Sequence, residues 1–246
     1  KIGFVNTPMN TTIQQINNLI EFRQAVHQTG LGKNRDALFE LVDALIERPQ
    51  ASCAADISLS PLFRRSWSSL YKAVETGQVN EASLAALFVQ QVPVSGVQVY
   101  PLDSTMWAHP AARTLDGLVY GPSPTKALKR HSIVQGHEYS LLGWTATPRQ
   151  SWTLTVAIER VQPSSNSLEV GVRQVQWLCQ QRQATGDEVL DVVVADGHYG
   201  NHRFFSPLRQ EPCALLARLR RDPGLYCPPG PHKGRGRRPQ QGAPVA

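Results

Sequence analysis

Two aspartates combine a residue type with a setting that suits metal-ion chemistry. Asp103 ends a strand-like stretch at residues 97–103, and Asp196 directly follows a nearly continuous apolar run at residues 189–195. An apolar run of this kind is typical of a buried strand, and the ends of strands are where ligands meet a sheet. Carboxylates from neighbouring strands supply the oxygen ligands that Mg²⁺ prefers, and two such ions can assist a phosphodiester displacement. We therefore predict a metal site at Asp103 and Asp196.

Each aspartate also has a plainer interpretation when it is taken alone. Asp-Gly is a common turn dipeptide, and an aspartate before Ser-Thr fits an Asx-turn. His198 is either a phosphate contact or a surface loop residue, and His109 has a similar position after Asp103. Zinc-ligand spacing, the G-x-S-x-G motif and the P-loop motif do not occur in the sequence. Taken together, and in an order of strands that can bring them side by side, the two aspartates favour a metal site over two separate turns.

The segments around the two aspartates predict a mixed sheet. We expect strands at residues 97–103, 139–147, 151–161, 189–195 and 213–219. An amphipathic helix around residues 168–179 and a short helix at 201–210 separate the later strands. Three consecutive strands followed by alternating helices and strands indicate a mixed sheet covered by helices. This order resembles that of the ribonuclease H-like fold.

The first ninety residues predict a small all-helical unit. Apolar residues recur at helical spacing in residues 13–20, 38–46, 62–74 and 84–88. We expect Asn34 and Asp36 to cap the second helix, Ser60-Pro61 to begin the third and Asn80 to cap the fourth. The segment from Arg48 to Ser60 is too long for the tight turn of a helix-turn-helix motif. A bundle that packs against the next domain is therefore expected, and contact with DNA stays open.

Composition limits the class of protein. The chain has 246 residues, of which 41% are hydrophobic and 18% are charged, which is enough for a packed core. No run reaches the roughly 18 apolar residues that a membrane span needs. Four cysteines without paired motifs fit a reducing cytoplasm and small buried roles. We expect three parts: a helical domain at residues 1–93, a mixed-sheet domain at 94–222 and a Pro/Gly/Arg-rich tail at 223–246.

The net charge of +6 is concentrated at the C-terminal end. Residues 1–213 hold 18 basic and 18 acidic residues, whereas residues 214–246 hold seven basic residues and one acid, Asp222. A basic block attracts polyanions, nucleic acid first, although a solvated tail has the same charge pattern. The candidate DNA-binding residues are Arg218, Arg220, Arg221, Lys233, Arg235, Arg237 and Arg238.

Several short motifs follow one another over residues 20–238. They are residues 36–45 and 63–71 in the helical part, then residues 100–110, 151–153, 194–200 and 216–220. In this order the sequence resembles the DDE-type transposases of bacterial insertion sequences. The resemblance implies a fold of the α+β or α/β class, in which an N-terminal helical domain precedes a ribonuclease H-like mixed sheet flanked by helices.

The resemblance also implies a chemistry. Three carboxylates of such a core hold two Mg²⁺ or Mn²⁺ ions, and Asp103 matches the first carboxylate, which would bridge the ions. Asp196 matches the second. The ions would activate water to nick DNA at the element end, and then the freed 3′-hydroxyl to attack target DNA. The implied partners are the DNA of the element end, the target DNA and a second copy of the chain in a synaptic homodimer. The implied location is the nucleoid in a bacterial cytoplasm, and no membrane is involved.

The third carboxylate, a glutamate on a helix well after the fifth strand in this family, has no match. Glu211 precedes that strand, and Asp222 follows it too closely. Because the sequence starts at Lys1 and stops before the expected helix, we expect a fragment without its C-terminal element. The fragment is then a transposase in which loss of the third carboxylate weakens or abolishes activity, or it is a non-catalytic DNA-binding remnant. A metal-dependent nuclease or hydrolase of the same fold is a third interpretation.

Overall fold

The chain divides after Pro93 into two units, Lys1–Pro93 and Val94–Ala246. The computed structural model describes residues 9–112, 114–122, 133–146, 152–183, 189–219, 226–231, 234 and 242–243. The expected boundary between sheet domain and tail, at residue 222, lies outside the described residues.

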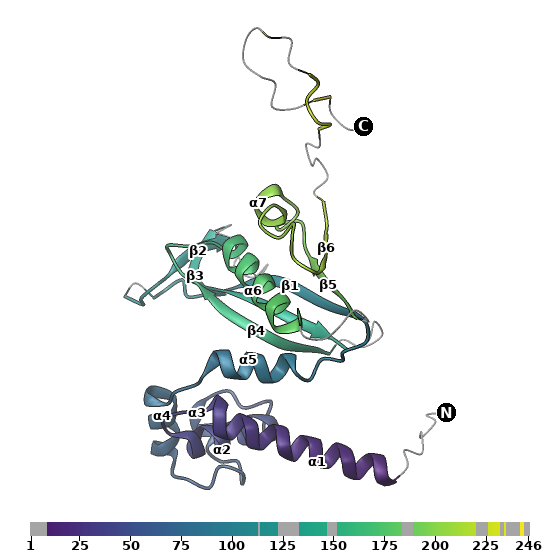
Figure 1. The fold of residues 1–246 in the computed structure, drawn as a ribbon. Helices are drawn as coiled ribbons and strands as arrows, with labels where there is room; N and C mark the ends of the chain where they lie inside the picture. The colour runs from purple at the N-terminus through teal and green to yellow at the C-terminus, as the bar shows by residue number, and fades with distance from the viewer. Residues whose placement is uncertain are drawn as a thin grey trace, which may run out of the picture. The chain divides into compact units, whose positions relative to one another are not determined.

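Helices build the described part of the first unit (Figure 1). They are α1 (Met9–Ala25), α2 (Arg35–Glu47), α3 (Ala54–Ile57), α4 (Trp67–Thr76) and α5 (Glu81–Val89), with the π-helical turn η1 (Val26–Gly30) after α1. The apolar side of α2 packs on α4 through Ala44 and Leu70, which enclose Phe63. Among the helices that the structure describes in either unit, none has the length and apolar character needed to cross a membrane.

The helix that was expected to begin at Ser60-Pro61 begins at Trp67 instead, so that prediction is wrong. Glu40 of α2 explains the difference, because its carboxylate holds the preceding segment in a non-helical path. Glu40 Oε2 accepts a hydrogen bond of 3.2 Å from the backbone N–H of Arg64, and Oε1 lies 3.2 Å from the Arg64 guanidinium. The guanidinium of Arg65 lies 3.3 Å from the same carboxylate. These are tertiary contacts, which a helical periodicity does not reveal.

The two predicted asparagine caps differ in outcome. The side chain of Asn80 accepts a hydrogen bond of 3.1 Å from the backbone N–H of Ser83, which confirms it as the cap of α5. Asn34 precedes α2 in a left-handed conformation, with φ of 61°, and makes no side-chain cap. Its amide instead donates to Thr76 Oγ1 at 3.0 Å. Asn34 therefore connects α2 to α4 instead of capping its own helix.

The second unit contains a six-stranded mixed sheet, which confirms the predicted fold class. Its strands are β1 (Gly96–Ala108), β2 (Val119–Pro122), β3 (Ile133–Thr145), β4 (Thr153–Val161), β5 (Val189–Ala195) and β6 (Ala214–Ala217). Strands β1, β3 and β4 form an antiparallel meander, and β2 also pairs with β3. On the other side of β1, β5 and β6 are parallel to it. This is the ribonuclease H-like arrangement, with three antiparallel strands followed by parallel ones.

Strand β1 is longer than its local sequence indicates. The sequence predicts a strand at 97–103 and turns from 104 onward, yet β1 continues to Ala108. The extension is stabilised by β3, because Asp103 pairs with Leu141 and Ala108 pairs with Gly136 in an antiparallel register. Asp103 is therefore an interior residue of a strand and not a strand end.

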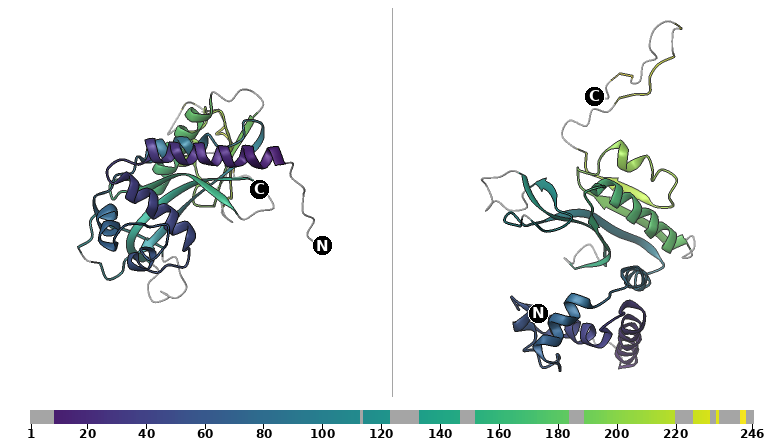
Figure 2. Two further views of the ribbon diagram at one scale, coloured as in Figure 1. Left: turned by 90° about the horizontal axis from the view of Figure 1, so that it is seen from below. Right: turned by 90° about the vertical axis from the view of Figure 1, so that its left-hand side faces the viewer.

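Helices cover one face of the sheet. Helix α6 (Ser167–Arg182) lies along this face and contacts β3 and β4, and the short α7 (His202–Phe205) packs on α6 (Figures 1 and 2). Between α6 and the sheet lie buried Tyr100, Leu102 and Leu142. Gly171 of α6 permits this close approach, because a Cβ there would lie 3.1 Å from Leu102 Cδ2 and 2.9 Å from Tyr199 Cε1.

Gly171→Ala should therefore destabilise the second unit. Overpacking a filled core costs about 1–3 kcal/mol, which exceeds the gain of roughly 1 kcal/mol from the helix propensity of alanine. Tyr199 is fully buried and has no room to move away. Urea unfolding followed by circular dichroism measures the difference. Gly230→Ala is the matched control, because a Cβ at Gly230 meets no atom within 4 Å. A Gly171→Ala variant as stable as this control would contradict the packing argument.

The four cysteines are all free, and only one is fully buried. Cys53 and Cys227 are exposed, so the small buried role expected for the cysteines does not describe them. Cys179 of α6 is buried and shares a hydrogen bond with Cys213, which precedes β6. This hydrogen bond raises the pKa of Cys179 and lowers the pKa of Cys213.

Candidate functional site

The pairing of β1 with β5 places Asp103 and Asp196 next to each other. The last parallel pair of these strands is Leu102 with Ala195. Asp103 is the next residue of β1, and Asp196 directly follows the end of β5. Both aspartates are exposed, whereas Leu102 and Ala195 are buried beneath α6. Because successive residues of a strand alternate between faces, Asp103 lies on the sheet face opposite α6. Two carboxylates therefore occupy the same level of adjacent strands.

Each carboxylate accepts a local backbone hydrogen bond through its Oδ1 atom. Asp103 Oδ1 accepts from the backbone N–H of Ser104 at 2.8 Å, and Asp196 Oδ1 accepts from that of His198 at 2.8 Å. These local hydrogen bonds match the Asx-turn interpretation and leave room for a ligand at the same time.

The loop that carries Asp196 is anchored by the residues that follow it. Tyr199 is fully buried, with its ring 5.1 Å from that of Phe204 in α7. Asn201 caps α7 by accepting from the backbone N–H of Arg203, and its amide donates to His198 O at 2.7 Å. Burial, and then the charges of Asp103 and Glu138, raise the pKa of Tyr199 to about 12. The Tyr199 hydroxyl is therefore neutral at physiological pH.

His198 connects this loop to the start of α6. Its Nε2 lies 3.1 Å from the hydroxyl of Ser167, the first residue of α6. The imidazole also packs edge-on against the ring of Tyr199, with centroids 5.3 Å apart. His198 is thus exposed but held in place, beside the aspartate that precedes it by two residues. Its role in the structure is to position the loop.

Arg218 is the one predicted DNA-binding residue that lies within the described ranges. Its backbone N–H donates to Ala195 O at 3.2 Å, and it directly follows the last β5–β6 pair, Ala195 with Ala217. Arg218 is exposed and is next in line to Asp196 across the sheet. The remaining candidates, Arg220, Arg221, Lys233, Arg235, Arg237 and Arg238, lie outside the described residues.

The described residues do not supply a third acid to the pair. Within them, no group of three or more His, Cys, Asp or Glu side chains is arranged to hold a metal ion. Glu211 precedes β6, whose first residue pairs at the level of Val192 in β5. Because β5 and β6 are parallel, Glu211 lies toward the end of the sheet away from Asp196. Asp222 is outside the described residues.

A comparison that covers most of the chain identifies its family. The family model described as DDE superfamily endonuclease matches residues 27–245. The chain belongs to the DDE superfamily of endonucleases. The resemblance to DDE-type transposases is confirmed at this level. A comparison with curated proteins gives no match.

Solved transposase structures are similar to this DDE superfamily chain. A piggyBac transposase synaptic complex with hairpin DNA is 12% identical, with a TM-score of 0.42, over 85% of this chain and 49% of that one. The Mos1 strand transfer complex is 13% identical, with a TM-score of 0.27, over 73% of this chain and 57% of that one. This chain therefore spans about half the length of the piggyBac transposase chain.

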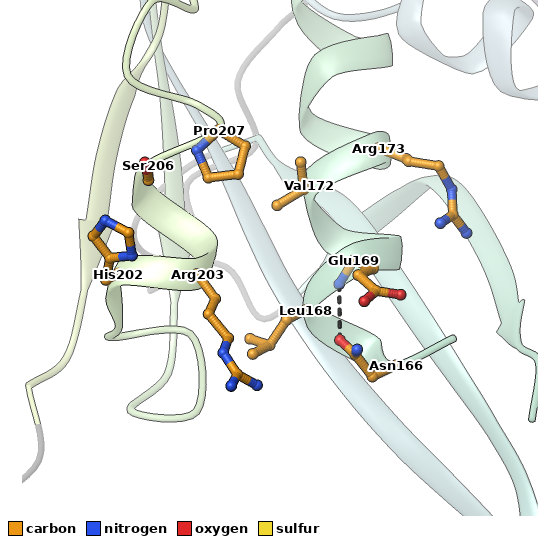
Figure 3. A pocket seen from close by; sticks show the side chains of 9 residues that line it. All are labelled: Asn166, Leu168, Glu169, Val172, Arg173, His202, Arg203, Ser206 and Pro207. Carbon is orange, nitrogen blue, oxygen red and sulfur yellow. Dashed lines mark hydrogen bonds between the residues drawn. The ribbon is translucent and has the colours of Figure 1, made fainter. Parts of the chain in front are cut away.

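A pocket of about 670 Å³ between α6 and α7 was not predicted from the sequence (Figure 3). Its lining comprises Asn166, Leu168, Glu169, Val172, Arg173, His202, Arg203, Ser206 and Pro207. Asn166, which caps α6, adjoins Ser167 and so places the pocket beside the His198 loop. Arg203 extends from α7 toward Leu168, whereas Arg173 points away from α7 (Figure 3). Arg173 forms an ion pair with Glu159. Two segments distant in sequence form this pocket, so no single motif reveals it.

Proposed function

We propose that this member of the DDE superfamily of endonucleases is a DNA transposase, and that Asp103 and Asp196 form its metal-dependent site for phosphodiester cleavage and strand transfer. The observation that carries the proposal is the register of β1 and β5, which sets two exposed aspartates side by side. Two carboxylates at this spacing repel each other and repel a DNA phosphate, since all carry negative charge. A divalent cation held by these carboxylates would remove both repulsions.

The donor set fits Mg²⁺ or Mn²⁺. Both groups are exposed carboxylates, and Mg²⁺ is commonly held by one or two carboxylates together with substrate phosphate and water. When bound, such an ion stabilises charge on the phosphate and lowers the pKa of attached water. DDE superfamily endonucleases generally act with divalent metal ions. Two acids can hold one ion, and the two-ion site of this family calls for the third carboxylate as well.

The remaining residues of the site bind the DNA phosphate or position the loop that carries Asp196. Arg218, next in line to Asp196, offers a guanidinium to a DNA phosphate. The Asn201, His198 and Ser167 hydrogen bonds fix the loop so that Asp196 keeps its orientation. Membership of an endonuclease family and the basic residues at positions 214–246 support DNA as the partner. The proposal includes the ends of a bacterial insertion sequence as substrate, a synaptic homodimer and action at the nucleoid.

The test is nicking of supercoiled plasmid DNA by the purified chain. We expect open circles to accumulate with Mg²⁺ or Mn²⁺, and no open circles in EDTA, because the aspartates need a cation to approach the phosphate. Circles produced equally in EDTA would contradict the assignment. The second candidate, a non-catalytic DNA-binding remnant, is favoured by one observation, the missing third acid among the described residues. It predicts DNA binding that ignores Mg²⁺, survives Asp103→Ala and Asp196→Ala, and is accompanied by no nicking.

A further inference from the structure

The face of the sheet that carries Asp103 changes along β1 from aliphatic side chains to aromatic and polar ones. Asp103, Thr105 and Trp107 alternate onto this face, and their partners on β3 are Leu141, Tyr139 and His137. Toward the start of β1 and across to β5 and β6, the exposed residues are aliphatic, and they include Val97, Leu190 and Leu216. The aspartates therefore lie at a border between an aliphatic area and an area with aromatic and polar side chains.

Trp107 is the most exposed member of the aromatic area. Its side chain is 64% exposed, although it stands on a central strand of the sheet. The Trp107 ring lies 5.4 Å from that of His109, which lies 5.2 Å from that of His137. His137 is buried and its Nε2 lies 3.0 Å from Asp116 O, so the back of the group is fixed. The result is a rigid indole with an open face.

Hydrogen-bond donors lie between Trp107 and the aspartates. Thr105 pairs with Tyr139 on β3, and Tyr139 pairs with Arg160 on β4, which gives a row of two hydroxyls and a guanidinium across the same face. Arg160 donates to Asp116 O at 2.5 Å and is held in this row. Four residues of a strand separate Trp107 from Asp103 by about 13 Å. A DNA strand with a phosphate at the aspartates can pass this row and reach the indole.

We propose that Trp107, supported by His109 and His137, stacks on an unpaired nucleobase of the DNA strand whose phosphate lies at Asp103 and Asp196. This inference rests on the proposed function for the position of that phosphate. The ligand is an unpaired base because bases inside a duplex are already stacked on their neighbours, whereas a free base exposes its face. Aromatic residues on a rigid surface bind such bases with little dependence on sequence. Thr105, Tyr139 and Arg160 contact the intervening backbone.

The experiment measures DNA binding by the full chain with Ca²⁺ in place of Mg²⁺, so that the aspartates still have a divalent cation to bind, and a denaturing gel checks that the probe stays uncleaved. The probe is a short fluorescent duplex with an unpaired 3′ extension, compared with the same duplex bearing abasic sites in the extension. We expect Trp107→Ala to weaken binding of the first probe about tenfold, the order expected for loss of one stack. Trp107→Phe should restore most of the affinity. Trp152→Ala is the matched control, since Trp152 is 83% exposed and lies outside this area.

The abasic probe separates stacking from general attraction to DNA. The original chain should bind it about as weakly as Trp107→Ala binds the intact probe, and Trp107→Ala should cause no further loss. Equal affinities of Trp107→Ala and the original chain for the intact probe would overturn the inference, as would an equal loss on the abasic probe. Thermal unfolding of each variant checks that the sheet is intact.

The outcome also distinguishes this inference from the proposed function. If plasmid nicking depends on Mg²⁺ and on Asp103 but Trp107→Ala binds normally, the stacking site is wrong and the function stands. If nicking never occurs but Trp107→Ala loses affinity for the intact probe alone, the cleavage proposal fails and the base-binding surface stands.

Discussion

Asp103→Asn and Asp196→Asn should each reduce metal-dependent plasmid nicking at least about a hundredfold, since even residues that only support a metal ligand change affinity or activity by about 10–100-fold. The substitution keeps the size of the side chain and the oxygen that accepts from Ser104 or His198. It removes the negative charge that the cation requires. Initial rates of open-circle formation in Mg²⁺ measure the effect.

Asp116→Asn is the matched control for this pair. Asp116 is exposed in the same unit, and its interactions with His137 and Arg160 use the backbone carbonyl and not the carboxylate. The control should nick at the rate of the original chain. Full activity in either Asp103→Asn or Asp196→Asn would show that the paired aspartates are turn residues and not ligands.

Asp191→Ala should destabilise the second unit by about 3–5 kcal/mol, the usual cost of removing one member of a buried ion pair. Asp191 lies in the middle of β5, and its two oxygens accept from the Arg182 guanidinium at 3.1 and 3.2 Å. The side chains are only 4% exposed for Arg182 and 10% exposed for Asp191. The substitution removes the Asp191 carboxylate from a guanidinium that is itself buried. Urea unfolding at neutral pH measures the loss.

Glu159→Ala provides the comparison on the surface. Glu159 pairs with Arg173 of α6, and both side chains are roughly half exposed, with relative accessibilities of 43% and 52%. Water and salt screen such a pair, so its removal should cost no more than about 1 kcal/mol. Similar losses in Asp191→Ala and Glu159→Ala would show that burial of the Arg182 pair does not matter, contrary to the structure.

Secondary structure was predicted best in segments whose conformation follows from their own local sequence. The strand expected at 189–195 is β5 with the same bounds, because a strand buried on both faces is apolar along nearly its whole length. The helix expected around 168–179 is the centre of α6. Asn80 was recognisable as a cap because its hydrogen bond to Ser83 is local.

Predictions failed where partners distant in sequence decide the conformation. The end of β1 depends on β3, and the start of α4 depends on Glu40 of α2. The aromatic area around Trp107 was missed for the same reason, since its members come from β1, the loop after it and β3. Alternation along residues 103, 105 and 107 was the available signal, but this stretch was interpreted as turns.

The sequence by itself determined the family, the mixed class of the fold and the two aspartates that merit a test, because these depend on residue types in a fixed order along the chain. Only the tertiary structure decided which residues stand together. The parallel register of β1 and β5 sets Asp103 beside Asp196, and β6 adds Arg218 to the same level. Strand register is fixed by hydrogen bonds between distant segments and by burial of one face beneath α6. The spacing of residues along a single strand does not reveal either of these.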